Sequence, residues 1–166
     1  MLQSHRHGLA ALAALAALCA PALGADDPGI ARLAACQDSW VDWQKSDPAK
    51  LKAFGDRFRA SFTHKDNDPY TVPIKPISFD GLPIAQVFPS SVGMGVGFSL
   101  TVDATFDTAR QVLEHRIGKP LGHCETSDGM RTCELQFAEQ RTATVMASDD
   151  PKAKQTLIGC YYFYEK

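Results

Sequence analysis

The pair Asp128-Gly129 constrains the fold of this chain more than any other feature, because it lies midway between Cys124 and Cys133. A two-residue hairpin loop of type I′ needs positive φ at both positions, and an Asp-Gly pair supplies it. With these two residues as the loop, Cys124 faces Cys133 at a non-hydrogen-bonded site, where Cα atoms are about 4.5 Å apart and within disulfide range. Two independent signals therefore predict a hairpin closed by a disulfide.

Cys36 and Cys160 are the other cysteines outside the N-terminal leader, and we expect them to form a second disulfide. This bridge would join an N-terminal helix to the last strand. It closes a long loop, and such cross-links stabilise a fold largely by restricting the unfolded chain.

A metal site formed by His123, Cys124 and Cys133, with His115 as a fourth ligand, is the alternative role for these cysteines. His123 and Cys124 are adjacent, so their side chains would point to opposite faces of a strand. We therefore expect disulfides, no metal and no cofactor.

The first 25 residues have the three parts of a secretory signal peptide. Arg6 gives a basic start, the apolar run Leu9–Ala20 follows, and small residues precede Asp26. The run is shorter than the roughly 20 residues that a membrane-spanning helix needs. A buried N-terminal helix is the alternative, but the run has no polar face to present to water. We therefore predict cleavage after Gly24 or Ala25, with Ala25 preferred, and a periplasmic or secreted protein.

A lipid anchor would need a cysteine at the end of the apolar run. Cys19 lies inside the run and follows Leu18, where a small residue is required. Leu33-Ala34-Ala35-Cys36 has suitable residue types, but Asp26 and Asp27 separate it from the run. We expect no lipid anchor.

Residues 26–166 are predicted to form a single α+β domain with a helical part (28–62), an extended segment (63–91) and a β-α-β-β-β-β part (92–166). The expected fold class is an N-terminal helical hairpin followed by a mostly antiparallel sheet. One crossing helix and two disulfides complete it.

Apolar residues recur at helical spacing over 29–45 and again over 48–62, so we expect two helices that form the hairpin. Ser46-Asp47-Pro48 supplies the cap and the first-turn proline of the second helix. A third helix is predicted over 107–117 and ends at Gly118.

The clearest strand is 92–102, in which apolar residues alternate with small and polar ones. The last strand, 156–164, is apolar on both faces, and this pattern favours a central strand covered on both sides. Shorter strands are expected at 70–74, 84–88 and 141–147.

Gly93, Gly95 and Gly97 alternate along the predicted strand 92–102 and are candidate binding residues. A phosphate-binding loop connects a strand to a helix, whereas these glycines lie inside a strand. Their small face would let another backbone or a helix approach closely. The alternative is a groove that accepts a ligand or the chain of a partner.

Trp40 and Trp43 are the second pair of candidate binding residues. They continue the apolar stripe of the first predicted helix, which indicates core packing. The alternative is an aromatic platform for a sugar or a protein partner.

The sequence contains no Gly-x-Ser-x-Gly, no His-Glu-x-x-His and no Walker loop, so we assign no catalytic residue. We expect His64, His115 and His123 to be structural or solvated. A small secreted hydrolase that uses His123 or His115 with nearby carboxylates is the enzyme alternative. The acidic turn Asp66-Asn67-Asp68 resembles a weak calcium site but lacks the later ligands of an EF-hand.

The formal net charge of −2, without a cluster of Lys or Arg, argues against nucleic-acid binding. No second apolar run is long enough to span a membrane. The leading hypothesis is a small exported, non-enzymatic binding protein, such as an inhibitor, an immunity protein or an envelope accessory factor. Its partner would be another protein or an envelope component. A structural envelope component held by the segment 63–91 is a further alternative.

Mass spectrometry of the protein purified from its native compartment is expected to find Asp26 at the N-terminus and no lipid on any cysteine. A thiol reagent added under denaturing conditions should leave all cysteines of the mature chain unmodified, because thiols in an exported protein oxidise. Four reactive thiols, or a diacylglyceryl addition, would contradict this prediction.

Overall fold

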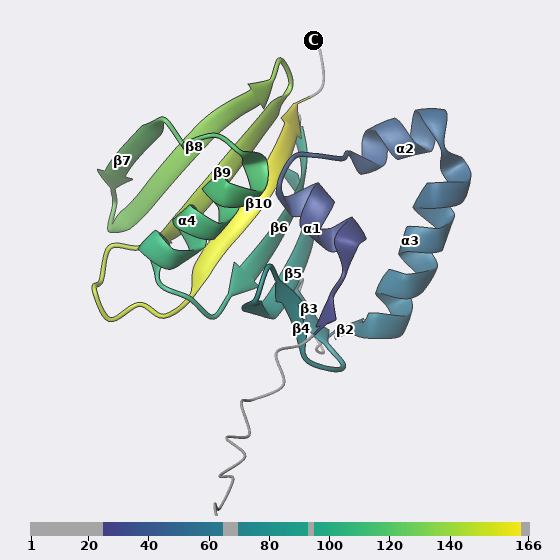
Figure 1. Cartoon of the computed structure of the whole chain (residues 1–166), viewed down its shortest axis with the longest axis horizontal. Helices are drawn as coiled ribbons and strands as arrows, with labels where there is room; N and C mark the ends of the chain where they lie inside the picture. Colours follow the sequence, from purple (N-terminus) through teal and green to yellow (C-terminus); the bar gives the residue numbers. More distant parts are fainter. Residues whose placement is uncertain (1–24, 65–69, 93–94, 164–166) are drawn as a thin grey trace, which may run out of the picture.

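The computed structural model describes residues 25–64, 70–92 and 95–163, and within them four helices and ten strands form an α+β fold (Figure 1). The helices are α1 (Pro28–Ala34), α2 (Trp40–Ser46), α3 (Pro48–Ser61) and α4 (Phe106–Ile117). The strands are β1 (Ala25–Asp26), β2 (Phe62–His64), β3 (Thr71–Pro73), β4 (Ile77–Phe79), β5 (Leu82–Val92), β6 (Gly95–Val102), β7 (His123–Ser127), β8 (Met130–Ala138), β9 (Arg141–Ser148) and β10 (Thr156–Phe163).

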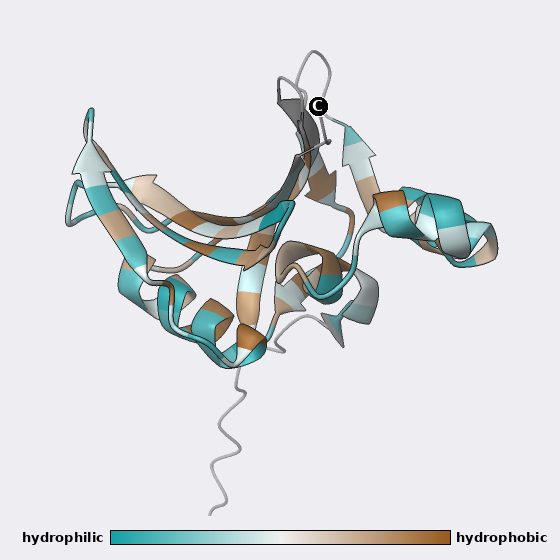
Figure 2. Ribbon diagram, turned by 90° about the horizontal axis from the view of Figure 1, so that it is seen from above, coloured by the Kyte–Doolittle hydropathy of each residue, from teal (hydrophilic) through white to brown (hydrophobic). Residues whose placement is uncertain are grey.

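The strands form one sheet in the order β1-β4-β5-β6-β10-β9-β8-β7, with β3 attached to β5 and β2 to β3. Neighbouring strands are antiparallel except for the short β1, which pairs with β4 in parallel. Figure 2 shows a deeply curved sheet with α1 and α4 against its convex side. α1 contacts β6 and β10, and α4 contacts β9 and β10, so both helices cover the centre of the sheet from the same side.

The β7–β8 hairpin has the predicted register. Asp128 and Gly129 form its loop with φ values of 52° and 74°, as a type I′ turn requires. Cys124 pairs directly with Cys133, and the two form a disulfide with a Cα–Cα distance of 4.0 Å. The sequence-based prediction of this cross-link is confirmed.

The second predicted disulfide, Cys36–Cys160, is also present and joins the end of α1 to the central strand β10. The single helix expected over 29–45 is wrong, because the chain leaves the helical conformation at Cys36, which has a φ of 58°. A new helix, α2, starts after Ser39, whose Oγ accepts a hydrogen bond from the backbone N–H of Asp42. The apolar spacing continues through both helices, so periodicity did not reveal the break.

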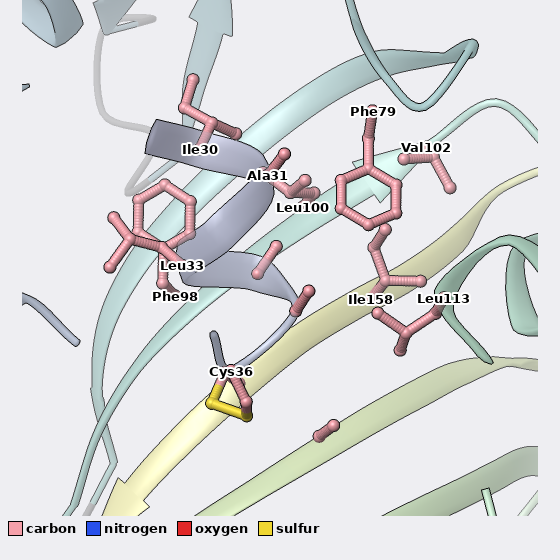
Figure 3. Packing of buried hydrophobic residues seen from close by; sticks show 14 of the residues in the cluster. Ile30, Ala31, Leu33, Cys36, Phe79, Phe98, Leu100, Val102, Leu113 and Ile158 are labelled. Carbon is pink, nitrogen blue, oxygen red and sulfur yellow. A yellow bond between two sulfur atoms is a disulfide. The ribbon is translucent and has the colours of Figure 1, made fainter. Parts of the chain in front are cut away.

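The hydrophobic core lies between α1, α4 and the convex side of the sheet. Figure 3 shows Ile30 and Leu33 of α1 packed over Phe98 of β6, and Ile158 of β10 beside Leu113 of α4. All five side chains are buried. The Cys36–Cys160 disulfide lies at the edge of this cluster (Figure 3) and joins the end of α1 covalently to β10.

The last strand departs from the prediction in one respect. β10 is central in the sheet, between β6 and β9, as its apolar pattern indicated. Helices cover only the face that carries Ile158 and Cys160. Leu157 and Tyr161, which alternate with them, are half-buried on the concave side, where no helix of the described part of the chain packs. The expectation of cover on both sides is therefore wrong for these residues.

The other elements follow the predictions with shifted ends. α3 and α4 form as expected, and α4 starts after Thr105 and ends at Gly118, which has a φ of 74°. The strand expected at 84–88 extends over the whole of β5. The strand expected over 92–102 is β6 from Gly95 onward, while residues 93–94 lie outside the described ranges.

Substitution of Gly159 by Ala tests a close contact between strands β6 and β10. A Cβ at Gly159 would lie 2.7 Å from Ser99 Cβ and 2.9 Å from the carbonyl oxygen of Phe98, which is too close for β6 and β10 to keep their separation. We expect Gly159→Ala to lower the free energy of unfolding by about 1–3 kcal/mol, measured by denaturant titration. Gly122→Ala is the control, because no atom lies within 4 Å of its added Cβ. Equal midpoints for the two variants would contradict the prediction.

Candidate functional site

The concave face of the sheet is the first candidate surface. Cys160 points to α1 through its disulfide, so its neighbours Gly159 and Tyr161 point to the opposite face. The strand register shows which residues of the other strands point to the same face as Gly159 and Tyr161. We call this set of residues the concave face. It comprises Gln86 and Phe88 of β5, Gly97, Ser99 and Thr101 of β6, Leu157, Gly159 and Tyr161 of β10, Thr142, Thr144 and Met146 of β9, Thr132, Glu134 and Gln136 of β8, and His123 and Glu125 of β7.

Small and hydroxyl-bearing residues form the floor of this face. Thr144, Gly159 and Ser99 are aligned in one cross-strand row, and all three are buried although no helix among the described residues covers them. Aromatic rings stand at the β5 end of the row, where the rings of Tyr70 and Phe88 pack with centroids 4.9 Å apart. The centre of the concave face therefore carries small, mostly polar side chains, and aromatic side chains lie beside it.

Tyr161 is the largest side chain of the central strand on this face. Burial raises the pKa of its phenol above the usual value, although a hydrogen bond with Ser99 opposes the shift. The charges of Glu134 and Tyr70 raise this pKa further. At neutral pH Tyr161 is therefore a neutral phenol, able to donate a hydrogen bond.

The β7–β8 end of the concave face is acidic. Glu125 and Glu134 are exposed, and His123 Nε2 lies 3.8 Å from the Glu125 carboxylate. Both partners of this contact are largely solvated, at 75% and 64% side-chain exposure. The pair is therefore wider than a hydrogen bond and lacks the burial that tunes a catalytic base.

The second candidate surface is an apolar groove between the α2–α3 helices and strands β5 and β6. We call it the hairpin groove, and its volume is about 180 Å³. Phe54 and Phe58 of α3 contact the ring of Phe98 of β6, with ring centroids 6.1 Å and 6.4 Å apart. The groove is lined by Trp40, Leu51, Phe54, Gly55, Phe58, Arg59, Pro89 and Phe98. A second hollow of about 240 Å³ shares Trp40 and Leu51 with it.

The two tryptophans predicted as candidate residues have different environments. Trp43 is buried, with its ring edge-on to Phe54 at 5.5 Å and the Lys50 ammonium over its face. Trp40 is half-buried and lines the hairpin groove. Core packing therefore describes Trp43, and Trp40 forms part of a surface hollow.

The candidate glycines and Trp40 do not form one site. Gly97 lies on the concave face opposite Tyr161, whereas Trp40 is on the side of the helices. Gly95 begins β6, and Gly93 lies outside the described residues. The sequence signals therefore lead to two separate surfaces on opposite sides of the sheet.

The remaining candidate residues form no site in the part of the chain that the structure describes. His64 and His115 are exposed, and the acidic turn at 66–68 lies outside the described ranges. Within those ranges no group of three or more His, Cys, Asp or Glu side chains is arranged to hold a metal ion. No helix among them is both long and apolar enough to cross a membrane.

A third hollow, of about 340 Å³, lies between the start of α4 and the β9–β10 loop. Its only cationic lining residue is Arg131, which stacks over the ring of Phe106 at 4.2 Å and pairs with Asp107 at 3.0 Å. These two contacts attach the start of α4 to β8.

Tyr162 positions the helices that form the hairpin groove. Its hydroxyl donates a hydrogen bond to the carbonyl oxygen of Asp38, in the segment between α1 and α2. Arg141 pairs with Asp42 of α2 and lies over the Tyr162 ring. The start of α2 is thus attached to strands β9 and β10, which holds Trp40 near Phe98.

Comparison of the chain with models of known families, with curated proteins and with solved structures finds no match.

Tyr162→Phe tests the attachment of α2. Loss of the hydrogen bond to Asp38 is expected to lower the free energy of unfolding by about 1 kcal/mol at pH 7. Burial raises the pKa of Tyr162 in the folded state, so its stabilising contribution is complete below the unfolded value of about 10 and is lost as the pH rises above it. Denaturant titrations between pH 7 and 11 should show a shallower alkaline loss of stability in the variant. Identical pH profiles would contradict the assignment.

Proposed function

We propose that this chain is an exported, non-enzymatic binding protein and that its concave face docks a protein partner bearing basic residues. One observation carries the proposal: the central strand presents Leu157 and Tyr161 on a sheet face that no described helix covers. An antiparallel sheet with a solvated face normally carries polar residues there. Apolar and aromatic residues on such a face are typical of an interaction surface.

The composition of the concave face supports a protein as the partner. Tyrosine is enriched in protein interfaces because its ring buries a large area while its hydroxyl retains a hydrogen bond. Tyr161, Tyr70 and Phe88 supply such rings around the low floor of Ser99 and Gly159. A partner's side chain or backbone could approach the sheet closely over this floor.

The charge of the concave face supports basic residues on the partner. Glu125 and Glu134 are exposed at one end of it, and no Lys or Arg belongs to the set that defines the face. Complementary charges mainly steer association and orient the two proteins. The partner's basic residues would then meet β7 and β8.

The two disulfides support export. Such cross-links persist in oxidising compartments and are rare in the cytosol. Cys36–Cys160 and Cys124–Cys133 also hold the helices and the β7–β8 hairpin to the sheet. A preformed surface loses less conformational entropy on binding than a flexible one.

Site-specific photocross-linking in the native cell envelope tests the docking face. A photoreactive residue at position 157 should give one discrete protein adduct, and the same residue at position 111, exposed on α4 of the convex side, should give none. With the identified partner, Tyr161→Ala should weaken binding by about tenfold or more, as expected for a central aromatic contact. Gln111→Ala should leave the affinity unchanged. Absence of an adduct at position 157, or equal adducts at both positions, would refute the proposal.

A further inference from the structure

The lining of the hairpin groove is apolar except for one charged residue. Its lining combines Trp40, Leu51 and two phenylalanines of the helices with Pro89 and Phe98 of the sheet. Arg59 is the single charged residue in this lining. A ligand that fits it would therefore need an apolar body and one anionic group.

The Arg59 guanidinium lies beside Gly55, one helical turn earlier on α3. A Cβ added at Gly55 would be 3.4 Å from Arg59 Nη1, so the missing side chain gives the guanidinium room to lie back along the helix. This arrangement places a group with several N–H donors at the wall of an apolar groove. Guanidinium groups bind carboxylates through paired, charge-assisted hydrogen bonds.

The charge around Arg59 remains positive although it has an acidic partner. Asp56 accepts hydrogen bonds from both Lys52 Nζ at 2.7 Å and Arg59 Nη2 at 2.6 Å. These bonds lower the pKa of Asp56, with Lys52 the larger cause, so its carboxylate stays ionised beside two cations. One unit of positive charge is left over, and Arg59 keeps donors that Asp56 does not use.

We propose that the hairpin groove binds the alkyl chain of a free fatty acid, with its carboxylate on Arg59. The apolar lining buries the chain, and the single cation selects an anionic head group. The surface is separate from the concave face, because the groove opens on the side of the helices and the concave face lies across the sheet. The two proposals can therefore fail independently.

The size of the groove and its single charge favour a fatty acid over larger partners. A hollow of about 180 Å³ beside one of about 240 Å³ suits a single alkyl chain, whereas a membrane lipid brings two chains and a bilayer. A protein interface would normally need a larger area with a polar rim. Binding of the groove to vesicles or to a peptide would therefore contradict the proposal.

Tryptophan fluorescence reports on this groove, since Trp40 lines it and Trp43 packs behind Phe54. The protein, produced with its own leader in a bacterial export host, would be titrated with dodecanoate below its micellar concentration. We expect a saturable change in emission. Dodecanol should bind about tenfold more weakly because it lacks the charge, and dodecyltrimethylammonium should not bind. Vesicles of anionic phospholipid should produce no change.

Two arginines of α3 provide a matched pair of variants. Arg59→Gln should weaken dodecanoate binding about tenfold and leave dodecanol binding unchanged. Arg57→Gln is the control, because Arg57 is exposed, does not line the groove and lies 4.0 Å from Asp27. Circular dichroism would confirm that both variants fold, and Tyr161→Ala on the concave face should bind dodecanoate normally.

Three results would overturn the proposal. The first is no saturable change with dodecanoate. The second is equal affinity for dodecanoate and dodecanol, or equal losses in the Arg59 and Arg57 variants, since either would show that Arg59 does not recognise the head group. The third is a response to anionic vesicles alone, which would assign the groove to a membrane surface.

Discussion

The Cys36–Cys160 disulfide is the constraint on which the rest of this structure depends. It joins the end of the first buried helix to the central strand, across most of the length of the chain. The chain leaves the helical conformation at Cys36 and begins a new helix after Ser39. The α2–α3 helices lie to one side of α1 (Figure 1). The hairpin groove is lined by residues of these helices and of β5 and β6.

Local sequence patterns, such as turn residues, cysteines and apolar spacing, predicted much of the fold and little of the candidate sites. The Asp128-Gly129 turn and its cysteines specified a register that the structure confirms, because a type I′ turn and a disulfide each permit few geometries. The apolar spacing of α1 continues into α2 and hides the break at Cys36, and the local signal for the new helix is its N-cap, Ser39. The hairpin groove could not be predicted, because it arises where Phe54 and Phe58 of α3 meet Phe98 of β6 and no pattern along the chain relates those positions.

The apolar pattern of the last strand correctly predicted its central position but not the exposure of its concave side. Apolar residues on both sides of the last strand indicated a central position, and β10 is central. The same pattern predicts cover on both sides, but Leu157 and Tyr161 are only half-buried. Apolar residues indicate that a surface is to be covered, and they do not indicate whether the cover belongs to the same chain. This distinction is the physical reason for proposing a partner for the concave face.

The short strand β7 has a consequence for how this protein tolerates reducing conditions. All five of its residues are exposed, and it borders the sheet with few contacts beyond β8 and the Cys124–Cys133 bridge. Once that bridge is reduced, β7 would be held on β8 mainly by the backbone pairing of the hairpin. If β7 detached, residues 130–134 of β8 would present unpaired backbone groups at the border of the sheet, where another copy of the chain could add a strand. The small bridge would thereby limit self-association under reducing conditions.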